Sequence, residues 1–300
     1  MARAPLQPGR LLPRRLLGTA NDAFRAGRMT ILIVLVGLII SHFATGFRHF
    51  RKFGWLAPLL IAVSRRFPQW PWLPAVFVVV FSVLASVLAI WLVTALLGLT
   101  GWFLLALAVF ILTLGPRDLD RDVAVLLSPD PDDPAAVEDA RRAMQLDEAA
   151  GPCEGVAAVL HAGLSRWFGL LFWFVLLGIA GALIYRLTRV GLQSASLDPA
   201  AIEWLARLRL VLDWPVLALL SLSLALAGDL DRVLAAWRAQ AAPLPTWLLV
   251  PSQIDRLAEA ICGELPDLEA GLELGHQMVW RMLILWLVVL SMLLLAGWLS

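Results

Sequence analysis

Five charged side chains occur within six positions directly after a long apolar stretch. They belong to LGPRDLDRDV, residues 114–123, and are Arg117, Asp118, Asp120, Arg121 and Asp122. Charges beside hydrocarbon are costly and are usually paired or functional, so this cluster could bind a charged ligand. It could instead be the solvated start of a helix after Gly115-Pro116, with its acids near the positive end of the helix dipole. We take Arg117 and Asp118 as candidate site residues.

A second set of polar residues borders two later apolar segments. Arg209 and Asp213 are spaced i,i+4 directly before an apolar run, and Trp214 follows them. Arg186 follows the apolar segment 167–185, which ends at the single tyrosine of the chain. A local ion pair that eases insertion into the membrane is one interpretation of Arg209 and Asp213. The other is a ligand or partner site that includes Arg186, Arg209, Asp213 and Trp214.

The sequence contains none of the common catalytic motifs. There is no Gly-rich phosphate loop, HExxH, GxSxG or CxxC, and the four histidines are scattered. Cys153 and Cys262 occur in unrelated contexts, so they indicate neither a disulfide framework nor a metal site. We therefore predict no catalytic residue, no metal and no cofactor.

The composition is typical of an integral membrane protein. Hydrophobic residues make up 60% of the 300 residues, only 16% are charged, and the mean hydropathy is +0.81. The net charge of +1 gives no basic field for a nucleic acid partner. Many of the 14 tryptophans lie near the ends of apolar segments, where an interfacial belt would place them. The lipid bilayer is therefore the expected surrounding.

The apolar segments predict an all-α fold. They are 31–47, 72–115, 167–185, 214–228 and 278–300. The block 72–115 is long enough for two crossings joined by GLTGW, 98–102, whereas 214–228 is too short to cross alone. We expect a polytopic helical bundle of five to six membrane segments, with small helical polar insertions at about 116–166 and 229–277. Asp133-Pro134 and Asp198-Pro199 should each start a helix.

The charge pattern indicates a topology but leaves a conflict at the N-terminus. Residues 48–71 are basic and contain no acid, so we expect them, together with 116–166, on the cytoplasmic face. Residues 1–28 are also basic and would then lie outside. Either 31–47 does not cross, or the tail is not native and translation starts at Met29, which we favour. A signal peptide is a weaker interpretation, because no clear cleavage site follows 31–47.

Three blocks in this order resemble the AmpE family of bacterial inner-membrane proteins: LGPRDLDRDVAVLL, LFWFVLLGIAGALIYRL and LVLDWPVLALLSLSLALAGD. The resemblance covers about 29–300, which supports a single membrane domain and a start at Met29. It implies a regulatory or signalling protein of β-lactamase induction and peptidoglycan recycling. A cell-wall fragment or a cell-wall-recycling protein would be its partner, and the bacterial inner membrane its location.

At Arg117-Asp118-Leu119 and at LFW…GALIYR the chain is also similar to the adenosylcobinamide-phosphate synthases, members of the same superfamily, which form an amide bond in cobalamin assembly. The synthase pattern has a Glu-Asn pair where this chain has LSRWFGL, and Thr-Leu-Asp where it has LTRVGLQ. These departures favour a protein that is not an enzyme. The alternative is a membrane enzyme with nucleotide-dependent, synthase-like chemistry, and a carrier for a cell-wall fragment is a third hypothesis.

One expectation joins the two charged regions. The glycines in 167–185 permit a break in that helix, and 214–228 is short, so both segments could be incomplete. Arg117-Asp118 and Asp213 would then lie near one another on the cytoplasmic side. A plain six-span bundle would instead place Asp118 and Asp213 on opposite faces.

Overall fold

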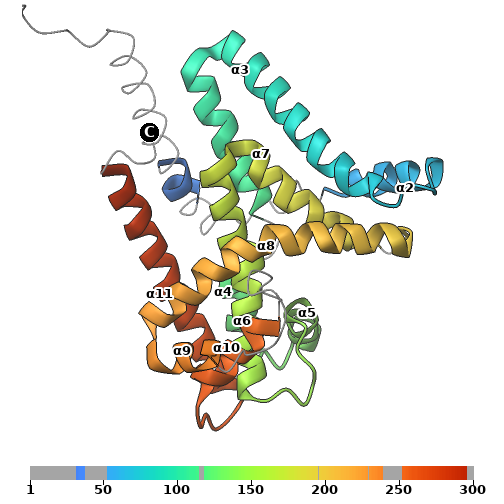
Figure 1. The fold of residues 1–300 in the computed structure, drawn as a ribbon. Helices are drawn as coiled ribbons and strands as arrows, with labels where there is room; N and C mark the ends of the chain where they lie inside the picture. The colour runs from blue at the N-terminus through green and yellow to red at the C-terminus, as the bar shows by residue number, and fades with distance from the viewer. Residues whose placement is uncertain are drawn as a thin grey trace, which may run out of the picture.

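The computed structural model describes residues 32–37, 53–114, 118–194, 196–228, 230–238 and 252–295. These residues form helices and contain no strand, which confirms the all-α prediction (Figure 1). After a short helical segment at 32–37, the helices are α2 (Leu56–Arg66), α3 (Leu73–Thr113), α4 (Leu119–Leu127), α5 (Pro134–Met144), α6 (Pro152–Gly163), the π-helical turn η2 (Leu164–Phe168), α7 (Gly169–Leu192), α8 (Pro199–Ala227), α9 (Leu230–Arg238), α10 (Ser252–Cys262) and α11 (Leu268–Leu295). The tail 1–28, Met29 and most of 31–47 lie outside the described residues.

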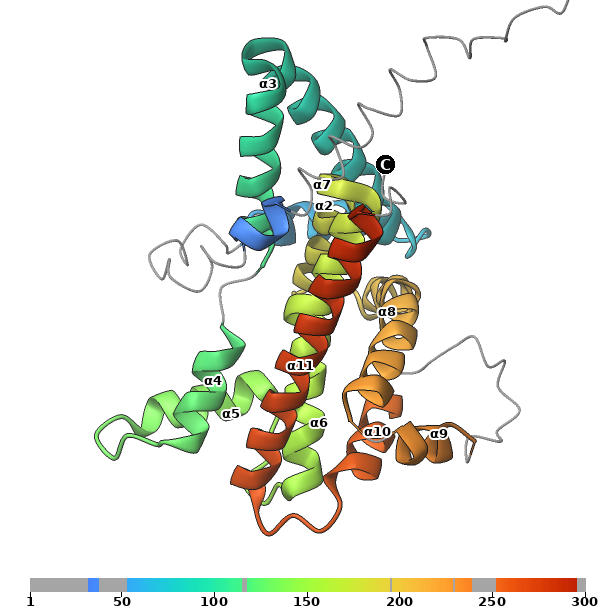
Figure 2. The same cartoon turned by 90° about the vertical axis from the view of Figure 1, so that its left-hand side faces the viewer.

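Four helical stretches within the described ranges are long and apolar enough to cross a membrane. They are α3, the continuous run of α6, η2 and α7, then α8, and finally α11. The protein is therefore an all-α membrane bundle. Helices α4, α5, α9 and α10 lie in the lower part of Figure 2, away from the apex of α3, with α4 and α5 on one side of α6 and α11 and with α9 and α10 on the other.

Two of these stretches are broken at a glycine and reverse direction. Gly98 in α3 has φ 60° and ψ −147°, and Gly178 in α7 has φ 62° and ψ −142°. Side-chain-bearing residues rarely adopt this conformation, so glycine permits the reversal. Figure 1 shows that each helix rises to the break and then descends. The turn expected at 98–102 thus begins at Gly98, and α7 has the break that Gly178 and Gly181 predicted.

Helix α8 starts after Asp198, as predicted, but it is longer than the incomplete segment expected at 214–228. It runs unbroken for 29 residues from Pro199, with Asp198 capping its start through a bond from the Ala200 amide. The polar stretch before Asp213 belongs to the same helix, and Pro215 lies inside it. The helix tolerates this proline, and the apolar run therefore gains length from the residues before it.

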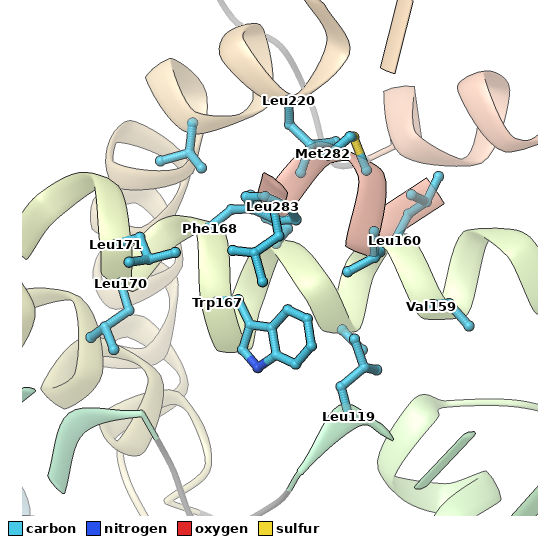
Figure 3. Packing of buried hydrophobic residues seen from close by; sticks show 14 of the residues in the cluster. Leu119, Val159, Leu160, Trp167, Phe168, Leu170, Leu171, Leu220, Met282 and Leu283 are labelled. Atoms are coloured by element: carbon cyan, nitrogen blue, oxygen red, sulfur yellow. The ribbon is translucent and has the colours of Figure 1, made fainter. Parts of the chain in front are cut away.

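The core lies where α11 packs along α6, η2 and α7. Figure 3 shows Leu119, Leu160, Phe168, Leu220 and Met282, from five different elements, converging on one cluster. Close approach of α11 and α6 requires small residues, because a Cβ on Gly271 would lie 2.1 Å from the Pro152 carbonyl oxygen. This packing holds the broken helix α7 against the polar helices.

Most of α3, in contrast, is not covered by protein. Leu84, Leu88 and Leu96 are more than 60% exposed, and this helix carries no charged residue. An apolar surface of this kind is stable in lipid rather than in water. The α3 hairpin therefore contacts the bilayer.

Cys153 in α6 and Cys262 in α10 form a disulfide. The sequence-based expectation of no disulfide was therefore wrong. The two residues are 109 positions apart, and their spacing alone gave no indication of a bond that depends on the packing of α10 against α6. The bridge links the two polar insertions.

Candidate active site

Asp213 is a carboxylate that is only 1% exposed. It lies in α8, where one of its oxygens accepts a hydrogen bond from the Tyr185 hydroxyl at 2.9 Å. Its other oxygen accepts a bond from Arg209 Nε, one helical turn earlier, at 3.1 Å. A buried carboxylate is costly unless it is paired and hydrogen-bonded. These two partners, from two helices, satisfy it.

Tyr185 lies in the part of α7 that follows the break at Gly178. It packs against the start of the same helix, before the break. Its ring packs directly over Gly169, where a Cβ would lie 2.1 Å from the ring carbon Cζ. Its hydroxyl also lies 3.4 Å from the Leu164 carbonyl oxygen. The reversal at Gly178 makes this approach possible, because it returns Tyr185 to the level of Gly169.

The π-helical turn η2 provides further polar groups beside Tyr185. Arg189, one turn after Tyr185, donates a hydrogen bond to the Ser165 carbonyl oxygen. Arg166 forms an ion pair with Asp122 of α4 at 2.7 Å, and both side chains are 9% exposed. Short π-helical insertions frequently occur at functional sites, where they shift side chains out of the regular helical pattern. Here the turn directs Arg166 toward α4 while Ser165 remains beside α7.

A cavity of about 250 Å³ opens next to these groups. Its described lining residues come from α3, α5, η2 and α7 and the turns beside them: Thr113, Leu114, Ala143, Ser165, Arg166, Leu170, Tyr185, Arg186, Arg189 and Gln193. Three of them are arginines and none is acidic. The guanidinium groups of this lining therefore favour an anionic group.

The predicted site residues are only partly brought together. Arg186 lines the cavity, Asp213 bonds the lining residue Tyr185, and Arg209 bonds Asp213. Asp118 caps α4, with its side chain accepting a bond from the Asp120 amide at 3.3 Å. Trp214 does not line the cavity and is 37% exposed. Arg117 lies outside the described residues.

The expected approach of Asp118 to Asp213 stays a prediction. Thr113 and Leu114, shortly before Asp118, line the cavity whose wall includes Tyr185, the partner of Asp213. The end of α3 and the partner of Asp213 thus line the same cavity, whereas Asp118 and Asp213 are not among its lining residues.

Sequence reasoning missed four residues of this site: Tyr185, Arg189, Arg166 and Ser165. Tyr185 is the only tyrosine of the chain and precedes Arg186, which was a usable signal. Arg166 and Ser165 lie in LSRWFGL, the block where the chain departs from the synthase pattern. Their roles depend on the π-helical turn and on the reversal of α7, and neither feature is apparent from hydropathy.

The described residues offer no evident site for a divalent cation. No group of three or more His, Cys, Asp or Glu side chains among them could hold a metal ion. Near the cavity, Asp122 and Asp213 are already engaged by Arg166 and by Arg209 with Tyr185. The residues therefore fit an anion better than a metal.

A comparison with known proteins finds a biosynthetic relative. The chain is 30% identical to the cobalamin biosynthesis protein CobD of Stutzerimonas stutzeri (strain A1501) over 179 residues. The alignment covers 55% of this chain and 57% of that protein, so the chain matches little more than half of its relative's length. No family model and no solved structure matches the chain.

This similarity changes the functional expectation. The prediction that the protein is not an enzyme was wrong, because the relative is a protein of cobalamin biosynthesis and points to a biosynthetic enzyme. The prediction gave more weight to the missing synthase motifs than to the shared blocks. However, Ser165 and Arg166 belong to the altered block LSRWFGL, and both line the polar cavity. The comparisons give no support to the AmpE family or to a role in β-lactamase induction.

Proposed function

We propose that this protein is a membrane-embedded biosynthetic enzyme that forms an amide bond and uses a nucleotide to activate a carboxylate. The observation that carries the proposal is the arginine-lined cavity beside the buried Tyr185–Asp213 pair. The similarity to CobD supports the reaction class, because the synthases that the sequence resembles form an amide in cobalamin assembly.

The cavity is suited to phosphate groups. Guanidinium groups bind phosphate oxygens through charge-assisted and often bidentate hydrogen bonds, and they stabilise charge that develops during transfer. Arg186 and Arg189 lie on one arm of α7, and Arg166 faces them from η2. With a volume of about 250 Å³, the cavity admits the reacting ends of two substrates rather than an entire large cofactor.

The proposed location is the bacterial inner membrane, with the cavity open toward the cytoplasm. Nucleotide is supplied there, and the basic stretch 48–71 favours that side for the ends of the α3 hairpin. The single membrane domain over 29–300 belongs to the same proposal. Contact with a cell-wall fragment or a cell-wall-recycling protein stays a prediction.

Complementation tests this function. A bacterium that lacks its own CobD and needs cobalamin for growth should grow when this protein is expressed. Arg189→Gln should reduce growth strongly, because it removes a charge from the cavity. Arg207→Gln should not, since Arg207 is exposed and pairs with Glu203 outside the cavity. The proposal fails if the wild-type protein inserts into the membrane but restores no growth and makes no corrinoid amide.

A further inference from the structure

Tyr185 is the one cavity residue with a titratable hydroxyl among those the structure describes, and that hydroxyl is bonded to a carboxylate. Tyr185 lines the cavity, and its Oη lies 2.9 Å from Asp213 Oδ1 and 3.4 Å from the Leu164 carbonyl oxygen. Asp213 itself does not line the cavity. Tyr185 therefore connects the cavity to a buried acceptor, and its hydroxyl is within hydrogen-bond distance of that acceptor, as general acid–base catalysis requires.

The surroundings fix the direction of this hydrogen bond. Arg209 Nε donates to Asp213 Oδ2 at 3.1 Å, which holds the carboxylate and leaves Oδ1 for the tyrosine. Gly169 leaves no space for the ring to move toward η2, because the ring already lies where a Cβ would be. Arg189 lies one turn away but is bonded to the Ser165 carbonyl oxygen. A proton accepted by Tyr185 from the cavity thus has one short path, to Asp213.

The geometry points to Tyr185 as a catalytic proton-transfer group and to Asp213 as the acceptor that acts through it. The inference deepens the proposed function and rests on it. The amine nitrogen attacks the carbonyl carbon of an acyl phosphate, formed from the carboxylate and the nucleotide. The C–N bond forms and the C–O bond to phosphate breaks, with its electron pair leaving on the phosphate. The nitrogen loses one proton to Tyr185 Oη, whose own proton passes to Asp213 Oδ1.

The pair is restored when the phosphate departs. The proton on Asp213 returns to Tyr185 Oη, and Tyr185 transfers the proton that it took from the amine to a phosphate oxygen. The residues then return to their starting state, and the products are the amide and hydrogen phosphate. Arg209 is a positioning residue in this scheme, since it orients Asp213 without contacting the cavity.

The test uses the full chain in lipid nanodiscs, with ATP, a corrinoid carboxylic acid and an amino-alcohol phosphate as probes. The corrinoid carboxylic acid and the amino-alcohol phosphate are the two compounds that an amide bond joins in adenosylcobinamide phosphate. Tyr185→Phe and Asp213→Asn should each lower kcat by about 100-fold or more and change KM by less than about threefold, because they remove proton transfer and not binding. Arg207→Gln should leave both constants unchanged.

A second readout separates a chemical role from a structural one. Because Tyr185 is the only tyrosine, biosynthetic labelling with 3-fluorotyrosine gives one fluorine resonance. This resonance should stay narrow in Asp213→Asn, which shows that the ring remains seated, while kcat falls. Variants that keep more than a third of the wild-type kcat would overturn the inference and leave the proposed function intact. A wild-type protein that makes no amide from these probes would overturn both.

Discussion

At the scale of single residues, the site depends on a buried carboxylate that has two partners from two helices. The sequence identified Arg209 and Asp213 by their i,i+4 spacing before an apolar segment, and the structure places them in one ion pair. It could not identify Tyr185 as the second partner, since 28 positions separate Tyr185 from Asp213. That contact exists because α7 reverses direction, which is a property of backbone conformation and not of composition.

Gly169→Ala tests how tightly Tyr185 is seated. The added Cβ would overlap the ring, at 2.1 Å from Cζ and 2.2 Å from the hydroxyl oxygen, so the ring must shift from its place over Gly169. Overpacking of this kind costs about 1–3 kcal/mol of stability. We expect a lower thermal midpoint in detergent and a shifted fluorotyrosine resonance.

Gly191→Ala is the matched control for that substitution. It lies on the same helix, and its Cβ would approach only side-chain ends of Leu205 and Leu60, at 3.1 Å. It should leave the fluorotyrosine resonance unchanged. An identical resonance in Gly169→Ala and the wild type would contradict the seating of Tyr185 described above.

At the scale of elements, two glycine breaks determine the architecture. The length of 72–115 predicted two crossings, the glycines of 167–185 predicted a weak point, and both helices are broken. For α8, the helix expected to start at Asp198-Pro199 does run into 214–228, but the length that its polar turn adds was not counted toward a crossing. In the structure that turn is helical, and its charges are satisfied by α7 and by each other.

Gly178→Ala should disrupt the reversal of α7. The position has φ 62°, and an added Cβ would have no neighbour within 4 Å, so the cost is one of backbone conformation rather than of space. A non-glycine residue in such a conformation costs about 1–3 kcal/mol. Chemical denaturation should show this loss, and the Tyr185–Asp213 contact should weaken with it.

Leu177→Ala provides the comparison for Gly178→Ala. Leu177 is the preceding residue, is 51% exposed and lies on the lipid-facing surface, so truncation should have little effect. Equal stability of the two variants would show that the reversal does not depend on glycine.

At the scale of the whole molecule, one bridge joins the two polar insertions to each other. The Cys153–Cys262 disulfide closes a stretch of 109 residues that includes η2, α7 and α8. Such bonds form mainly in oxidising compartments, whereas the basic stretch 48–71 indicates a cytoplasmic polar face. The redox state of this pair therefore depends on the side of the membrane on which the polar insertions lie. Both the redox state and the orientation can be measured.

Reduction of the bridge should lower the stability of the protein. Cross-linking over a loop of this length stabilises the folded state by about 4–5 kcal/mol in the chain-entropy model. Dithiothreitol should lower the unfolding midpoint of the wild type and should have no effect on Cys262→Ser. Equal midpoints with and without reductant would mean that the bond is absent in the purified protein.

Orientation is tested by labelling introduced cysteines in a Cys153→Ser, Cys262→Ser background. Arg51→Cys and Asp132→Cys should react alike with a membrane-impermeant maleimide, because the α3 hairpin returns the chain to the side it came from. Protection of both in intact cells is the result expected for a cytoplasmic polar face. Opposite labelling of the two positions would contradict the hairpin.

The most direct test of the central claim, that the arginine-lined cavity binds a nucleotide substrate, is an ATP titration of the purified protein by calorimetry. We predict saturable binding that weakens at least tenfold in the Arg186→Gln, Arg189→Gln double variant. Charge-assisted hydrogen bonds contribute about 1.5–3 kcal/mol each, and about 1.4 kcal/mol corresponds to a tenfold change in affinity. Arg207→Gln should bind ATP as the wild type does. Equal affinity of the double variant and the wild type, or no ATP binding by the folded wild-type protein, would contradict the account.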